Sequence, residues 1–247
     1  MTIRIAMWSG PRNLSSAMMR SFGSRSDTFV SDEPFYGCFL KSTGADHPMR
    51  DEVIDAMDCD WTSVMGNLSG PAPDGSPVWY QKHMWHHMAG PIGYDDFEGF
   101  RHAFLIREPE RMIASYLRKR EVAAFEDFGI ERQAEFFDRE ADRLGRAPPV
   151  IDAGDLLENS EGVLSKLCLA LGIAWDPAML GWAPGPRRTD GPWAPHWYRT
   201  VEASTGFAAT DGDAIELPRE AQSLAERCRS YYDKLALYRI LAERSDR

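Results

Sequence analysis

The hydrophobic and polar positions of this chain predict short strands that alternate with helices. Strands are expected at 2–8, 28–31, 78–82, 103–106 and 150–151, where short apolar runs stop at turn residues. Helical spacing of apolar residues and good helix formers predict helices at 15–24, 35–41, 51–57, 109–120, 131–145, 160–171 and 217–243. This alternation favours an α/β fold, with a mostly parallel central sheet and helices on both faces.

The chain is expected to form a single domain over residues 1–247, because it contains no repeat, low-complexity tract or interdomain linker. Residues 174–216 are irregular and rich in tryptophan and proline. Two interpretations of this segment stay open. It is a lid that folds over a binding site and lines a pocket, or an aromatic cluster that holds the C-terminal helix at 217–243 in place.

The overall charge argues against nucleic acid as the main partner, because the formal net charge is −10 and nucleic-acid affinity comes largely from Lys and Arg. Local Arg residues and backbone N–H groups can still hold a small anion. The four cysteines are widely spaced without a C-x-x-C pair, so we expect reduced thiols and no metal site. Neither a signal-peptide pattern nor a membrane-span pattern occurs, and we expect a cytoplasmic location.

The first candidate site is the turn between the strand at 2–8 and the helix at 15–24. The first N–H groups of a helix are unpaired and its dipole adds partial positive charge, so an anion is stabilised there. Arg12 would add a full charge; the alternative is an ordinary capped helix with a solvated Arg12. The residues of this candidate anion site are Gly10, Pro11, Arg12, Asn13, Leu14, Ser15 and Ser16.

This turn is not a Walker A loop. Counted from Gly10, the positions that would need Lys and a magnesium-binding hydroxyl hold Ser16 and Ala17. The pattern therefore disfavours a magnesium-dependent NTPase.

The second candidate site is the segment that follows the strand at 103–106. Arg107 stands at the C-terminal end of that strand, and ligands of open α/β sheets bind at this edge. Ser115 lies eight residues further on, about two turns into the next helix. The two side chains could hold one phosphate. Alternatively, Arg107 pairs with an acid such as Glu110 and Ser115 fills space between helix and sheet.

Together the two segments resemble the sulfotransferase family. The run 11–16, Pro-Arg-Asn-Leu-Ser-Ser, is similar to the family's 5′-phosphosulfate loop, with Arg12 where Lys is usual and Leu14 at the place of the loop glycine. Arg107, Ser115 and the following Tyr116 are similar to its 3′-phosphate motif, at the same spacing. The resemblance implies the P-loop nucleotide-hydrolase-like architecture of that family.

Weaker likenesses extend the resemblance to about residues 3–173. A strand followed by Asp-Leu-Leu at 155–157 is one, and a helix that ends in Leu-Gly-Ile at 171–173 is another. The C-terminal Arg-Lys-Gly element of the animal cytosolic members is not evident, and Arg187 and Arg188 are candidates to replace it.

The resemblance implies transfer of a sulfuryl group from 3′-phosphoadenosine 5′-phosphosulfate (PAPS) to a hydroxyl or amine of a small-molecule acceptor, without a metal. Sulfuryl transfer resembles phosphoryl transfer, in which positioning and charge stabilisation do most of the work. Arg12 would stabilise the oxygens of the moving group, and the N–H groups of residues 13–16 would hold the 5′-phosphate. Arg107 and Ser115 would hold the 3′-phosphate.

Two residues are candidates for the base that accepts the proton of the acceptor. Glu33 is the first, because it follows the strand at 28–31 near the C-terminal edge of the sheet and some bacterial members have a catalytic Glu in a similar stretch. The alternative is a surface Glu that begins a helix before Pro34. His83 is the second, although animal members carry the corresponding His one position later than this chain does; the alternative is a histidine that caps or packs. Lys82 is expected to contact the sulfuryl group.

Two other functions remain as alternatives: a P-loop kinase-like phosphotransferase, and a non-catalytic nucleotide-binding module. The first would need magnesium ligands and a loop Lys, which the turn at 9–16 lacks. The second would keep Arg107 and Ser115 without turnover. The sequence names neither the acceptor nor the oligomeric state.

Overall fold

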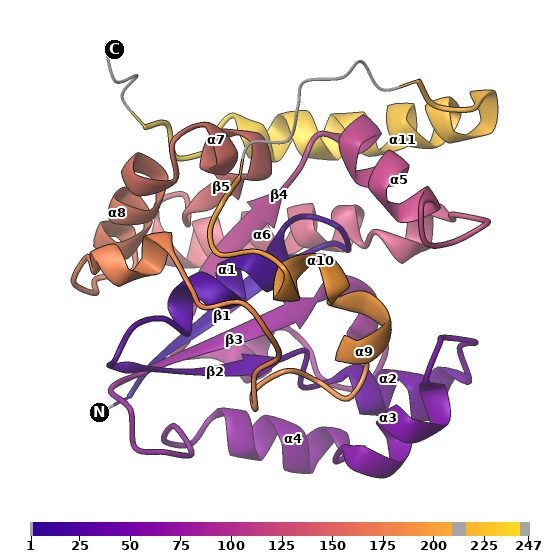
Figure 1. Ribbon diagram of the computed structural model, residues 1–247. Helices are drawn as coiled ribbons and strands as arrows, with labels where there is room; N and C mark the ends of the chain where they lie inside the picture. Colours follow the sequence, from indigo (N-terminus) through magenta and orange to yellow (C-terminus); the bar gives the residue numbers. More distant parts are fainter. Residues whose placement is uncertain (1, 209–215, 243–247) are drawn as a thin grey trace.

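A parallel sheet forms the centre of the protein, whose computed structural model describes residues 2–208 and 216–242 (Figure 1). Its strands are β1 (Ile3–Ser9), β2 (Thr28–Asp32), β3 (Val78–Met84), β4 (Arg101–Ile106) and β5 (Val150–Asp152). Their order across the sheet is β2-β3-β1-β4-β5, and every neighbouring pair is parallel. The predicted α/β class and the position of each predicted strand are confirmed.

The strands are buried on both faces, and alternate side chains enter two different cores. On β1, Ile5 and Met7 belong to one core, whereas Ala6 and Trp8 belong to the other. On β3, Tyr80 lies in the first core and Trp79 in the second. This alternation decides below which side chains reach the candidate site.

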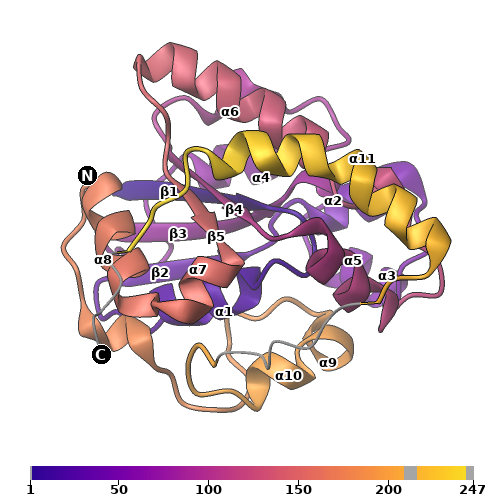
Figure 2. The same ribbon diagram turned by 90° about the horizontal axis from the view of Figure 1, so that it is seen from above.

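Helices cover both faces of the sheet (Figure 2). The first core contains residues of α1 (Ser15–Phe22), α2 (Tyr36–Thr43), α3 (Arg50–Ala56), α7 (Ala153–Glu158) and α8 (Ser160–Ala170). The second contains residues of α4 (Trp61–Leu68), α6 (Ile130–Leu144) and the end of α11 (Arg219–Ala236). A third cluster joins α5 (Pro109–Leu117) to α11. None of the described helices has the length and apolar character that a membrane span requires.

The segment between β2 and β3 holds three helices, so the expectation of two was wrong. The missing helix is α4, whose first turn is capped by Asp60: its side chain accepts a hydrogen bond from the Ser63 N–H. The short helix α7 was also missed. Asp152 caps it in the same way, because its side chain accepts from the N–H groups of Gly154 and Asp155.

The C-terminal helix is shorter than the predicted 217–243. It ends at Ala236, and the following chain lies along the outer edge of β5, where Ile240 N donates to Val150 O. Pairing with an otherwise open strand edge satisfies backbone groups that a longer helix would leave unpaired. Residue 243 lies outside the described part.

The Trp/Pro-rich segment, described up to residue 208, runs over the α1 side of the sheet (Figure 1). It contains α9 (Ala194–Trp197) and α10 (Arg199–Glu202), as well as the 3-10 turn η4 (Pro177–Leu180). Other 3-10 turns are η1 (Trp85–His87), η2 (Tyr94–Phe97) and η3 (Phe125–Asp127). Trp193 is buried in the first core and meets Tyr36 edge-on. The aromatic residues of this segment therefore pack against the sheet, whereas α11 packs against α5 and α6.

Candidate functional site

The turn between β1 and α1 adopts a conformation that few side chains prefer. Arg12 has φ 63° and Leu14 has φ 66°, both in the left-handed region. Leu14 is the residue directly before α1, at the position where the family loop has glycine. A residue without Cβ adopts this conformation without strain, which gives the family glycine a physical reason. Gly10 is required for another reason: a Cβ there would lie 2.6 Å from the Phe128 carbonyl oxygen.

The two candidate sites predicted from the sequence meet in space. Arg12 Nε donates to Ser115 Oγ at 3.1 Å, and an Arg107 NH1 group donates to the Arg12 carbonyl oxygen at 2.7 Å. Arg107 does not pair with Glu110, which binds Arg229 instead. Asn13 ties the turn to β4, because its Nδ2 donates to Leu105 O at 3.4 Å. Ser115 and Ser15 are buried beside this contact.

This corner carries several positive charges, which the nearby Asp152 opposes only in part. Burial, and then the charges of Arg12, Arg111 and Arg118, lower the pKa of Arg107 to about 10. Burial and Arg118 also lower the pKa of Arg12. Among the described ion pairs, none includes Arg12, Arg107 or Arg118. Cations that repel one another in a partly desolvated place are stabilised by an anionic ligand.

The protein has a cavity beside Arg107 and a groove along β2. A cavity of about 690 Å³ is lined by Arg107 and Arg111, by acids that include Asp152 and Asp155, and by Tyr232 of α11. A larger groove of about 1950 Å³ follows the outer edge of β2 and reaches Asp32. The smaller cavity is continuous with the charged corner because Arg107 belongs to both.

Lys82, at the end of β3, is the centre of a second polar group. Its Nζ donates to Glu33 at 2.5 Å, to Tyr198 Oη at 2.6 Å and to Asp32 at 2.9 Å. It also lies 3.4 Å from Ser16 Oγ, which links it to the turn that carries Arg12. The Lys82 side chain is 1% exposed. Although burial alone would lower its pKa, the acids Asp32 and Glu33 raise the pKa of Lys82 well above its usual value, so it stays charged.

Glu33 follows β2 in a strained conformation, with φ 42°. One carboxylate oxygen accepts from Lys82, and the other, Oε2, lies 3.6 Å from His87 Nδ1. Burial raises the pKa of Glu33, against the opposing charge of Lys82, and Asp32 adds to the increase. A carboxylate with a raised pKa is a stronger base than a solvated one.

His83 does not lie with Lys82 and Glu33. It follows Lys82 on the strand and therefore points to the other face of the sheet, where it stacks on Trp8 at 4.6 Å between ring centroids. Its Nε2 lies 3.2 Å from Gln81 Oε1. Burial lowers the pKa of His83 to about 3. The one-position shift from the family pattern thus moves this imidazole away from Lys82 and Glu33.

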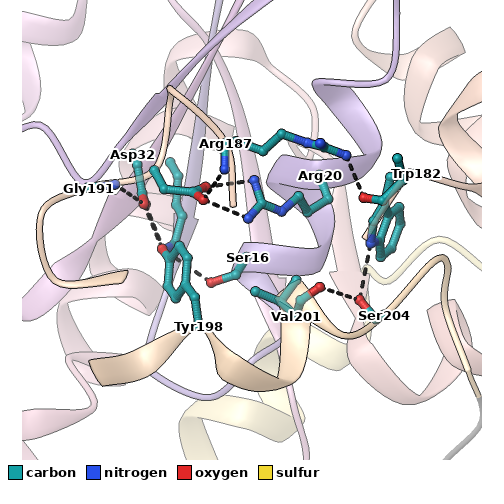
Figure 3. A network of polar contacts seen from close by, with 12 residues as sticks. Ser16, Arg20, Asp32, Trp182, Arg187, Gly191, Tyr198, Val201 and Ser204 are labelled. Carbon is teal, nitrogen blue, oxygen red and sulfur yellow. Dashed lines mark hydrogen bonds and ion pairs between the residues drawn. The ribbon is translucent and has the colours of Figure 1, made fainter. Parts of the chain in front are cut away.

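The structure adds Asp32 and Tyr198 to the residues predicted from the sequence (Figure 3). Tyr198 Oη lies within 2.9 Å of both Asp32 oxygens, and Gly191 N donates to Asp32 Oδ2. Arg20 of α1 forms a buried bidentate ion pair with Asp190. These contacts fasten the Trp/Pro-rich segment to the sheet. Asp32 could have been found from its place at the end of β2, but no local signal marks Tyr198.

Arg187 and Arg188 do not reach the charged corner. An Arg187 NH2 group donates to Ala183 O, its backbone N–H donates to Asp190, and Arg188 is exposed. His87 lies next to Glu33, and His86 meets the His87 ring edge-on. In the described part of the chain, no three His, Cys, Asp or Glu side chains are placed to hold a metal ion.

Comparison with known proteins identifies the family of this chain. A model of the sulfotransferase domain matches residues 3–236. The branched-chain-amino-acid aminotransferase-like protein 2 of Arabidopsis thaliana is 34% identical over 237 residues, which are 96% of this chain and 41% of that protein. The chain therefore spans less than half the length of this relative.

Two solved structures share the fold. The sulfotransferase domain from the curacin biosynthetic pathway is 17% identical with a TM-score of 0.55, over 93% of this chain and 97% of that one. The sulfotransferase from Alicyclobacillus acidocaldarius is 14% identical with a TM-score of 0.56, over 96% of each chain. The family match over residues 3–236 confirms the resemblance drawn from the sequence: this chain belongs to the sulfotransferase family of enzymes.

Proposed function

We propose that this protein transfers the sulfuryl group of PAPS to the hydroxyl or amine of a small molecule. The observation that carries the proposal is the meeting of Arg12, Ser115 and Arg107: Arg12 Nε donates to the Ser115 hydroxyl, Arg107 donates to the Arg12 carbonyl oxygen, and the two guanidinium groups repel each other. A donor with two phosphate groups and a sulfate supplies the negative charge that this corner lacks.

Each part of the donor has a candidate partner. The unpaired N–H groups at the start of α1, within residues 13–16, would hold the 5′-phosphate. The 3′-phosphate would bind Arg107 and Ser115. Arg12 donates to Ser115 and belongs to the turn itself, so it would lie between the two and stabilise the oxygens around the sulfur.

The transfer step needs a base, a nucleophile and a leaving group. The acceptor oxygen attacks sulfur while its proton passes to Glu33. The bond between sulfur and the bridging oxygen breaks, and its electron pair stays on the 5′-phosphate of 3′-phosphoadenosine 5′-phosphate. Lys82 and Arg12 stabilise the negative charge that spreads over the sulfuryl and bridging oxygens. In this scheme Asp32 and Tyr198 position Lys82.

Calorimetric titration with 3′-phosphoadenosine 5′-phosphate, beside AMP and ATP and without magnesium, tests the donor site. The wild-type protein is expected to prefer the 3′-phosphorylated ligand over AMP. Arg107→Ala should lower the affinity for the 3′-phosphorylated ligand by about tenfold or more, because a buried charged contact to phosphate is lost. The affinity for AMP should fall much less. Equal binding of AMP and the 3′-phosphorylated ligand would contradict the proposal.

Arg199→Ala is the matched control. Arg199 is exposed, so its removal changes the net charge by the same amount without touching the corner. If both variants lose the same affinity, the effect is general electrostatic attraction rather than a 3′-phosphate site.

A further inference from the structure

A second set of buried polar groups lacks partners, and it lies beside Glu33 rather than at the donor corner. Among the described residues, His86 Nδ1, His87 Nδ1 and Arg120 Nε are buried and make no hydrogen bond. His87 is only 2% exposed. An unsatisfied buried donor costs about 1–3 kcal/mol, so three in one neighbourhood indicate a missing polar ligand.

Several contacts place these groups together. Tyr36 stacks on His87 with 4.3 Å between centroids, and its hydroxyl lies 2.8 Å from His47 Nδ1. His86 and His87 meet edge-on at 4.1 Å. Burial, and then the charges of His47, Arg120 and Lys82, lower the pKa of His86 to about 3. The imidazoles are therefore neutral, and those of His47 and His86 lie within the electrostatic reach of Arg120.

Arg120 has no acidic partner in the described structure. Its NH1 group donates to the Asp46 carbonyl oxygen at 3.3 Å, and its guanidinium lies 5.8 Å from the centre of the Trp197 ring. The charges of Asp46 and Asp127 both raise the pKa of His47. Neither acid forms an ion pair with Arg120 among the described residues. Arg120 also lies close enough to the Tyr116 hydroxyl to lower its pKa. Its Nε is left without a hydrogen-bond partner, so this guanidinium can bind an anionic group that arrives with a ligand.

We propose that these residues form the acceptor site, and that the acceptor is a small hydroxyl compound that also carries a carboxylate. This inference rests on the proposed sulfuryl transfer. Glu33 Oε2 and His87 Nδ1 are 3.6 Å apart, so one hydroxyl can lie within hydrogen-bond distance of both. The carboxylate binds Arg120 as a charged pair, in which Nε takes part.

The chemistry of the step follows from this placement. The acceptor hydroxyl donates its proton to Glu33, and its oxygen forms the new bond to sulfur. His87 donates its Nδ1 proton to a hydrogen bond with the same oxygen and keeps that proton throughout. The bond from sulfur to the bridging oxygen breaks, and the electron pair leaves on 3′-phosphoadenosine 5′-phosphate.

Matched acceptor pairs test the proposal. Turnover of radiolabelled PAPS is measured with 4-hydroxybenzoate against 4-methylphenol, and with 4-hydroxybutanoate against butan-1-ol. The wild-type enzyme should prefer the carboxylate member of at least one pair by about tenfold or more in kcat/KM. Arg120→Gln should reduce that preference by about tenfold, Arg120→Lys should retain part of it, and the exposed control Arg199→Gln should leave it unchanged.

The outcomes separate this inference from the proposed function. Equal turnover of both members, or a preference that survives in Arg120→Gln, would overturn the acceptor class. So would the absence of turnover with both carboxylates in protein that binds 3′-phosphoadenosine 5′-phosphate with the expected preference. If the nucleotide itself fails to bind, the proposed function has failed first, and the acceptor inference falls with it.

Discussion

The two faces of the sheet at the end of β3 have opposite chemistry. Lys82 faces α1 and is surrounded by the oxygens of Asp32, Glu33 and Tyr198. His83, the next residue, faces the second core and is stacked on Trp8. Both are nearly inaccessible to solvent. Burial therefore does not distinguish these two side chains, whereas the charges around them do.

The largest expected effect comes from removing the cation of the polar face. Lys82→Met leaves two carboxylates buried without their partner, which should lower the free energy of unfolding by about 3–5 kcal/mol. Turnover should fall by about a hundredfold or more, since a charge that stabilises the transition state is lost. Urea unfolding and PAPS turnover measure the two effects.

His83→Gln is the control on the opposite face. It should keep turnover within about threefold of wild type and lose about 0.5–1.5 kcal/mol of ring stacking. A loss of turnover comparable to that of Lys82→Met would return His83 to the catalytic candidates.

The pH dependence of stability tests whether His83 is neutral in the folded protein. The pKa of His83 is lowered to about 3 in the folded protein, against about 6.5 when unfolded. The unfolded state binds the proton first, so the stabilisation is complete above pH 6.5 and is lost as the pH falls toward 3. The loss amounts to about 1.4 kcal/mol per pH unit for this one group.

Between pH 6 and pH 4, the free energy of unfolding of His83→Gln should accordingly depend less steeply on pH than that of the wild type. The difference in slope should correspond to one proton. The curve is obtained from urea unfolding at a series of pH values. Parallel curves for the two proteins would mean that His83 is already charged in the fold.

Tyr198→Phe tests how the Trp/Pro-rich segment is held to the polar face. The variant removes the hydroxyl that contacts Lys82 and both Asp32 oxygens. It should lower stability by about 1.5–3 kcal/mol, the usual worth of a hydrogen bond to a charged group. Hydrogen exchange should accelerate most in α9 and α10.

Tyr231→Phe is the matched control, because Tyr231 binds Glu131 at the surface. Its effect should stay within about 0.5 kcal/mol. Similar losses in the two variants would remove the argument that Tyr198 is a fastening point.

The smallest expected effect is at Leu14. Leu14→Gly relieves a left-handed conformation that costs about 1–2 kcal/mol, and the greater freedom of glycine in the unfolded chain offsets part of the gain. A net stabilisation of about 0.5–1 kcal/mol is expected in thermal unfolding. Leu14→Ala retains a Cβ and should bring no gain; equal gains would mean that the Leu side chain, rather than the backbone, is strained.

Most of the fold could be predicted from the sequence because it depends on local periodicity and turn chemistry. Each strand was found to within about two residues, as 28–31 against Thr28–Asp32 shows. The helices α4 and α7 were missed although Asp60 and Asp152 cap them, since each is short and has a weak apolar pattern. The end of α11 depends on pairing with β5, which no local pattern reveals.

The sequence by itself determined the α/β class, the turn at 9–16 and the Arg107–Ser115 spacing, because strand period, helix start and an eight-residue offset are properties of neighbouring residues. Only the tertiary structure decided that Arg12 meets Ser115, that Lys82 rather than His83 faces the site, and that Tyr198 reaches Asp32. A period of two puts adjacent strand residues on opposite faces, but it does not say which face carries the candidate site. That choice is made by packing between segments more than a hundred residues apart.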